Sequence, residues 1–91
     1  MQLAVVLFRG GLVLEAYLRE QSRLRPHVML AVPDLRKLFP DRLSFDLELI
    51  DLASACLVDL HSHCHVAALE DVEREALLHW RDQWFIGVVW R

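Results

Sequence analysis

The chain has 91 residues, of which 55% are hydrophobic, and its formal net charge is −3. This length accommodates a single domain over residues 1–91 and no second core. The apolar content excludes an intrinsically disordered chain, and the acidic balance argues against nucleic-acid binding. No run of apolar residues reaches the roughly 20 that span a bilayer, so we expect no membrane association.

Two elements are predicted before the first proline. Residues 2–8 are apolar at both odd and even positions, which is typical of a central strand that is buried on both faces. Gly10 and Gly11 interrupt this run. Residues 12–24 fit either a helix or a second strand that turns back at the two glycines. We prefer the helix because the stretch is rich in residues of high helix propensity, and Pro26 then ends it.

Residues 25–41 are predicted to be an insertion made of short pieces. Residues 27–32 form an extended segment in this interpretation. Pro33 suits the first turn of a short helix, and Pro40 stops that helix.

The clearest pattern in the sequence is an alternation of polar and apolar side chains over residues 42–49, followed by a second alternation over residues 55–66. A period of two is typical of half-buried strands. A helix over residues 52–60 is the alternative, but the alternation fits better. We therefore predict that the two stretches form the arms of an antiparallel hairpin.

The C-terminal part is predicted to contain one helix and one strand. Apolar residues over 69–80 recur at helical spacing, and acidic residues occupy the first turn, where the helix macrodipole favours them. Residues 84–90 are apolar on both faces, as expected of a strand.

The predicted order is strand, helix, insertion, strand, strand, helix, strand. This order indicates an α+β fold, with an antiparallel sheet and two main helices on one of its faces. It resembles the ferredoxin-like βαββαβ arrangement with an insertion at about 25–41. The resemblance concerns architecture alone, and folds of this kind carry many unrelated functions.

The predicted first and last strands, over 2–8 and 84–90, would leave an apolar sheet face opposite the helices. Such a patch would be larger than soluble monomers usually expose, so either residues 25–41 or a second chain covers it. A symmetric homodimer is the commonest arrangement of this kind, and we expect one. The interface residues would be Trp84, Ile86, Val88 and Trp90.

The stretch from Asp59 to His65 holds a His-x-His pair, His61 and His63, which would lie on one side of a strand. Their spacing of about 6.6–6.8 Å would allow both imidazoles to reach one zinc or nickel ion, with Asp59 or His65 as the third ligand. The alternative is an ordinary polar strand face. No other cofactor is indicated.

Cys56 and Cys64 are eight residues apart, too far to form a disulfide within one regular element. Two free thiols favour a cytoplasmic location. Cys64 would face away from its histidine neighbours on a strand, which argues against a catalytic pair. We expect Cys56 to be a small buried side chain.

No catalytic motif occurs in the sequence, so we expect a protein that is not an enzyme. The first hypothesis is a small protein-binding module, homodimeric, with a regulatory, inhibitory or adaptor role. The alternative is a transition-metal-binding or metal-sensing module that uses His61, His63 and a further ligand. A third hypothesis is a small enzyme whose active site leaves no motif in the sequence.

Overall fold

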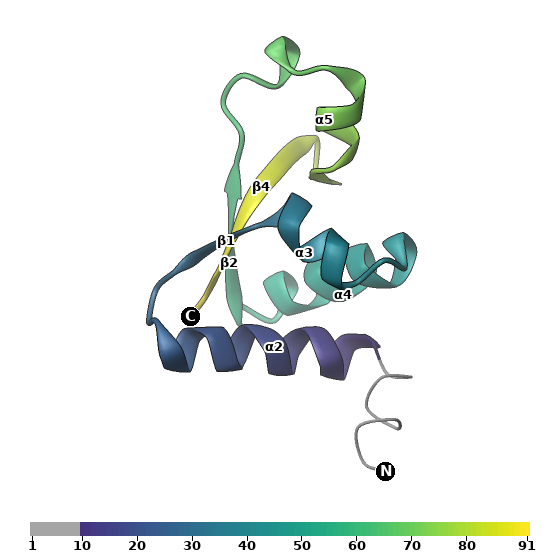
Figure 1. Ribbon diagram of the computed structural model, residues 1–91. Coiled ribbons are helices and arrows are strands. Elements are labelled where there is room, and N and C mark those ends of the chain that lie inside the picture. Colours follow the sequence, from purple (N-terminus) through teal and green to yellow (C-terminus); the bar gives the residue numbers. More distant parts are fainter. Residues whose placement is uncertain (1–9) are drawn as a thin grey trace.

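The computed structural model describes residues 10–91, so the strand that we expected over 2–8 lies outside the described residues. Within this range the protein is α+β, as predicted (Figure 1). The elements in chain order are α2 (Gly10–Leu24), β1 (Met29–Ala31), α3 (Val32–Leu38), α4 (Arg42–Ser54), β2 (Val58–Ser62), the 3-10 helix η1 (Val66–Ala68), α5 (Asp71–Glu75), β3 (Leu78–Trp80) and β4 (Gln83–Trp90).

The sheet is antiparallel and is organised around β4, which pairs with β1, β2 and β3. Val88 lies opposite Leu30 of β1 and Leu60 of β2, so these two strands flank β4 on opposite sides. Phe85 lies opposite both Ser62 of β2 and Leu78 of β3. Strands β1 and β3 therefore share one side of β4, and β2 takes the other.

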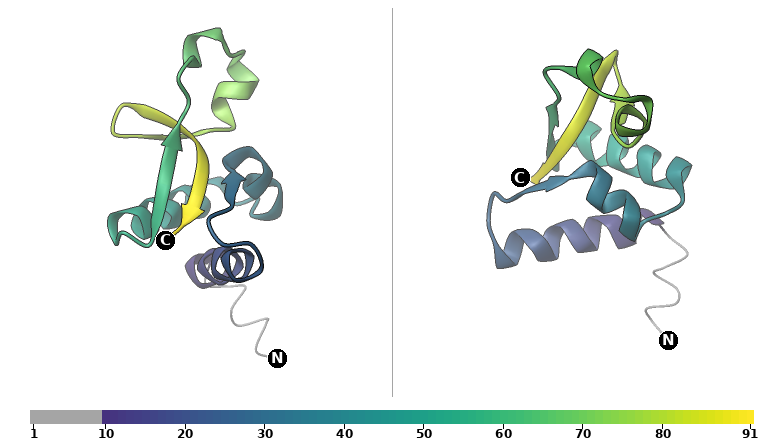
Figure 2. Two further views of the ribbon diagram at one scale, coloured as in Figure 1. Left: turned by 90° about the vertical axis from the view of Figure 1, so that its left-hand side faces the viewer. Right: turned by 45° about the horizontal axis from the view of Figure 1, so that its top comes forward.

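Helices cover one face of this sheet. In the left view of Figure 2 the sheet faces the reader and α4 lies behind it. Helix α2 crosses the end of the sheet where β2 begins and β4 finishes (Figure 1). The core between the layers consists of Leu14, Leu18, Val32, Leu35, Phe45, Leu49, Leu52, Val58, Leu78, Phe85 and Val88.

The expected strand over residues 42–49 is wrong, because these residues form the first part of α4. Asp41 caps the helix, since its side chain accepts a hydrogen bond from the Ser44 N–H. An alternating pattern also places every second apolar residue four positions from the next, which is a helical spacing. Phe45 and Leu49 are four residues apart and Leu49 and Leu52 are three apart, so all three lie on one buried face of the helix. The hairpin predicted between this stretch and residues 55–66 is therefore absent.

Helix α4 ends in a Schellman motif that directs the chain into β2. The Cys56 N–H donates to Ala53 O and the Leu57 N–H donates to Leu52 O, each at 3.0 Å. Cys56 occupies the left-handed position, with φ of 62°, and is exposed. The expectation that Cys56 is buried is wrong, because this turn directs its side chain outward.

The helix predicted over residues 69–80 is shorter than expected. Helix α5 covers Asp71–Glu75, and Glu70 and Glu73 form a capping box at its start. The chain then forms β3, which returns into β4 through a turn at Arg81 and Asp82. Both turn residues have positive φ, 53° and 61°, as in a type I′ turn. Arg81 is unusual in such a turn and the pair lacks the glycine that commonly marks it, so the sequence did not indicate the hairpin.

Other predictions are confirmed. Residues 12–24 are helical, within α2, and residues 84–90 belong to β4. Pro33 lies in the first turn of α3, and the strand predicted over 55–66 exists as the shorter β2. The ferredoxin-like order is not confirmed in the described residues, because the region treated as an insertion supplies β1 to the main sheet.

Helix α4 offers a matched test of this fold. Leu49 is fully buried and Leu47, two residues earlier, is 53% exposed. We expect Leu49→Ala to lower the free energy of unfolding by about 2–5 kcal/mol and Leu47→Ala to change it by under about 0.5 kcal/mol. Urea denaturation measures both values. Equal losses would contradict the assignment of α4.

Candidate functional site

Strand β2 lies at one edge of the sheet that residues 10–91 form. Two hydrogen bonds beside β2 show how it pairs with β4. The Arg91 N–H donates to Leu57 O at 2.9 Å, just before β2. The His63 N–H donates to Trp84 O at 2.8 Å, just after β2. Residues 57 and 63 therefore direct backbone groups toward β4.

The backbone orientation of the remaining residues follows from the antiparallel ladder. Hydrogen-bonded pairs alternate with non-hydrogen-bonded pairs along such a ladder, so every second residue faces the partner strand. Asp59 and His61 lie two and four residues after Leu57, so they also direct their N–H and C=O groups to β4. The residues that direct these groups away from β4 are Val58, Leu60 and Ser62.

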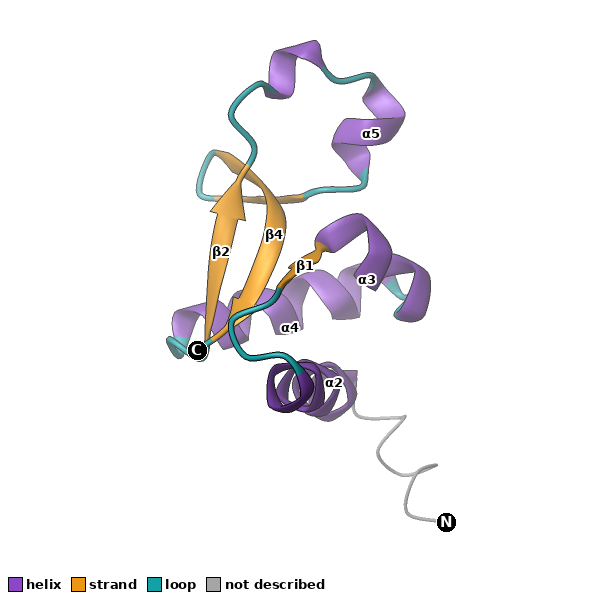
Figure 3. Ribbon diagram, turned by 60° about the vertical axis from the view of Figure 1, so that its left-hand side comes forward, coloured by secondary structure: helices purple, strands orange, loops and turns teal. Residues whose placement is uncertain are grey.

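In the part of the chain that the structure describes, this outer side of β2 is open toward Ser62 and closed at Val58, which is 3% exposed. No described strand pairs with it, and the loop after β2 rises beyond the end of the sheet (Figure 3). Asp59, His61 and Ser62 are exposed, and Leu60 is half-buried. Edge strands are commonly protected by Pro, Lys or an extra bulged residue, and β2 contains none of these. The register shift near His61 places its extra residue, Ile86, in β4.

The opposite edge strand is less suited to pairing. Strand β1 has only three residues, Met29–Ala31, and α3 follows it directly. Short edge strands resist pairing with another chain. Strand β2 is therefore the better edge for adding a strand.

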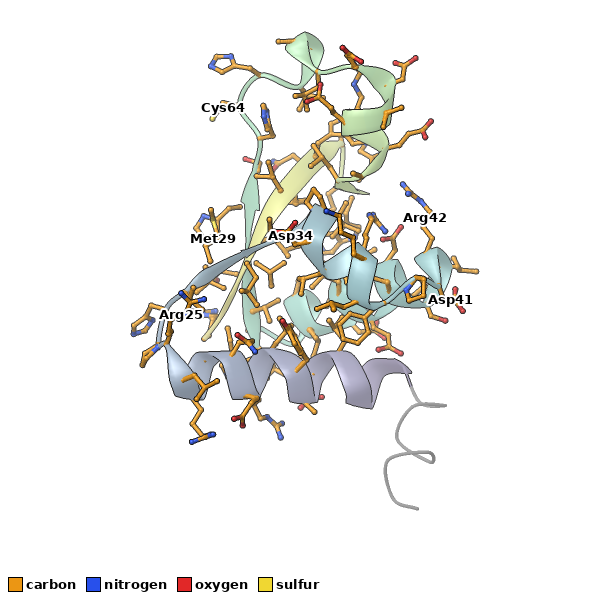
Figure 4. The ribbon with its side chains drawn as sticks, viewed as in Figure 1. Arg25, Met29, Asp34, Asp41, Arg42 and Cys64 are labelled. Carbon is orange, nitrogen blue, oxygen red and sulfur yellow. The ribbon has the colours of Figure 1, made fainter. Side chains whose placement is uncertain are left out.

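The sheet face turned away from the helices carries a small apolar area beside an ion pair. Met29 points to this side (Figure 4) and covers Gly87, where an added Cβ would lie 2.5 Å from Met29 Sδ. Asp59 and Arg91, both about half exposed, form an ion pair at 3.5 Å. Exposed pairs of this kind contribute little stability by themselves.

The four predicted interface residues lie in different environments. Val88 is fully buried in the core, and Ile86 is half-buried. Trp84 is half-buried and stacks on His79, with ring centroids 4.2 Å apart. Trp90 packs against the core, and the Arg19 guanidinium lies 5.5 Å from its ring. The structure therefore does not gather these side chains on one surface.

The histidines of the predicted metal site also differ in their surroundings. His61 lies in β2 opposite Gly87, whereas His63 follows the strand and accepts a hydrogen bond at Nδ1 from the His65 N–H, at 3.0 Å. Asp59 is held by Arg91. Over residues 10–91, no three His, Cys, Asp or Glu side chains are grouped so that they could hold a metal ion.

An arginine contact that the sequence did not indicate holds α5 against the body of the protein. Arg36 of α3 donates through Nε to Ala76 O and through Nη2 to Leu77 O, each at 2.8 Å. The same guanidinium forms an ion pair with Asp46 of α4 at 2.9 Å. Burial lowers the pKa of Arg36, and the Asp46 carboxylate partly opposes this effect.

Two further arginines extend this arrangement. Arg42, at the start of α4, donates to Glu75 O and reaches toward α5 (Figure 4). Arg74 donates to Leu69 O at 2.9 Å and to Val66 O at 3.4 Å. Cationic side chains stabilise the carbonyl end of a helix. These donors are thus used to hold the chain between β2 and β3.

No protein-family model, curated protein or solved structure matches this chain. The geometry of the described residues is therefore the basis for a functional proposal. Among those residues, no helix is long and apolar enough to cross a membrane.

The role of Arg36 can be tested against Arg42. The side chain of Arg36 is 12% exposed, and lysine cannot reach both carbonyls and Asp46 together. We expect Arg36→Lys to lower the free energy of unfolding by about 1–3 kcal/mol, because it leaves a buried carbonyl without a donor. The exposed Arg42→Lys variant should lose less than about 1 kcal/mol. Equal losses in guanidinium denaturation would contradict this role for Arg36.

Proposed function

We propose that the protein is a small protein-binding module that acts as a homodimer, in a regulatory, inhibitory or adaptor role and without enzymatic activity. The observation that carries this proposal is the outer edge of β2, where the N–H and C=O groups of Leu60 and Ser62 face away from β4 and where Leu60 is half-buried and Ser62 exposed. Pairing of such an edge with another strand supplies main-chain hydrogen bonds, which are a common source of protein affinity.

Exposed apolar side chains on α4 also support a protein partner. Leu43 and Leu47 are 69% and 53% exposed and lie one turn apart on the side of α4 opposite the core. Leu38, at the end of α3, is 54% exposed. Single exposed leucines are ordinary, but neighbouring ones provide the apolar area that binding surfaces use.

The location that we propose is the cytoplasm. Cys56 and Cys64 are both free and exposed, and such thiols are compatible with a reducing compartment. Metal binding by His61 and His63 stays a prediction from the sequence. No specific observation in the described residues favours it, so we do not propose it as a second function.

The dimer can be tested by substitution at Ser62, which is exposed at the end of β2. Proline there removes an outward N–H and leaves the pairs with β4 intact, as proline is tolerated at such edge positions. We expect the wild-type protein to change from one chain to two as its concentration rises in light scattering coupled to gel filtration. Ser62→Pro should raise the dimer dissociation constant at least about tenfold.

Ser62→Ala is the matched control, because it retains the backbone N–H, and it should dimerise as the wild type does. Circular dichroism establishes that each variant is folded. A wild-type mass of one chain at every concentration would overturn the homodimer. Equal dimerisation of the folded proline and alanine variants would show that the dimer forms elsewhere.

A further inference from the structure

We infer that the outer side of α4 binds an amphipathic helix of a partner protein, one that carries an apolar face with basic residues beside it. The inference rests on the proposed protein-binding role and names the kind of partner. It uses a surface separate from the outer edge of β2, so the two surfaces can be tested independently.

Helix α4 has apolar side chains on two opposite sides. Phe45 and Leu49 face the core, and Leu43 and Leu47 each lie two residues before one of them. Two residues correspond to about 200° around a helix, so these two leucines point away from the core, where they are 69% and 53% exposed. A helix that is apolar all round is normally buried all round. In the described part of the chain, only the core side of α4 is fully covered.

Helix α2 shows how a side that faces solvent is built in this protein. Its exposed surface carries two ion pairs within the helix, Glu15–Arg19 among them. Residues spaced four apart are neighbours on a helix surface. The line on α4 with this spacing consists of Leu43, Leu47 and Asp51, so two leucines stand where α2 has paired charges.

Asp51 supplies a negative charge at the end of this line. It is exposed, and its carboxylate forms no ion pair within residues 10–91. It lies in the last turn of α4, where the macrodipole disfavours an acid, so helix stability does not explain its place. Arg42 and Asp46 of α4 are instead engaged within the protein, with Glu75 O and Arg36. A basic group of a partner would complement the charge of Asp51.

The element that fits this surface is a helix. The backbone N–H and C=O groups inside α4 bond to one another, so its side offers a partner only side chains. The line from Leu43 to Asp51 forms a ridge, and such ridges pack into the grooves between side chains of a second helix. An apolar face on that helix would cover the two leucines, and a lysine or arginine at its border would reach Asp51.

Titration of the isotope-labelled full chain with two synthetic helical peptides, followed by NMR, tests this inference. Both peptides carry leucines at spacings of three and four, and the remaining positions hold lysine in one peptide and glutamate in the other. We expect the lysine peptide to shift the amide signals of α4 and to bind at least about tenfold more tightly than the glutamate peptide. Asp51→Lys should narrow this difference at least about threefold.

Leu47→Ala separates binding from folding, because Leu47 lies outside the core and its loss should leave the fold intact. It should weaken binding of the lysine peptide about tenfold. Leu24→Ala is the matched control, since it removes a similarly exposed leucine from the end of α2, and it should leave binding unchanged.

Loss of binding in Leu47→Ala with retention in Leu24→Ala supports the inference. Equal loss in both variants, equal affinity for the two peptides, or no shift in α4 at about 1 mM lysine peptide overturns it. Signals of α4 that move with protein concentration alone would assign the surface to a second copy, and signals of residues 2–8 that move in Leu47→Ala would assign it to the same chain. Either result also overturns the inference.

The outcome is distinguishable from that of the homodimer. A wild-type chain that dimerises but does not bind the lysine peptide overturns this inference alone. A wild-type chain that binds the peptide through α4 but stays monomeric at every concentration supports this inference and overturns the homodimer alone.

Discussion

Hydrogen bonding along both sides of β4 is the constraint on which the rest of the sheet depends. Strands β1 and β3 share one side of β4, and β2 takes the other side alone. The core residues Phe85 and Val88 of β4 are held between these neighbours and beneath the helices. Because both sides of β4 already have neighbouring strands, any further strand must pair with an outer strand of the sheet. Strand β2 offers the longer run of outward-facing backbone groups.

The chain between β2 and β3 is held by polar contacts together with the burial of Leu77, which is 2% exposed. Val72 of α5 is 78% exposed, whereas Arg36 reaches the carbonyls that follow α5 and Arg74 reaches those that precede it. These contacts keep η1 and α5 beyond the end of the sheet, where they do not cover the outer side of β2 (Figure 3). The arginine contacts and the accessible edge are therefore linked features of one arrangement.

Local patterns in the sequence predict some of this structure, and long-range pairing explains the rest. The alternation in β2 correctly places Val58 inward and Asp59 outward. The same period misleads over residues 42–49, although Pro40 and Asp41 there are ordinary signals for the start of a helix. The partner of β2 could not be predicted, because β4 is distant in sequence. The role of Arg36 was not predicted because its acceptors are backbone carbonyls. Every residue has such a carbonyl, so the sequence does not indicate which ones an arginine will bind.

Amide hydrogen exchange, measured by NMR at low and high protein concentration, tests the central claim that β2 pairs through its outer side. We expect the amides of Leu60 and Ser62 to exchange more slowly as the concentration rises, because a second copy supplies acceptors that residues 10–91 of one chain do not. The amides of Asp59 and His61, which already face β4, should be protected throughout. Protection of Leu60 and Ser62 that is independent of concentration, in a chain that dimerises, would contradict the account.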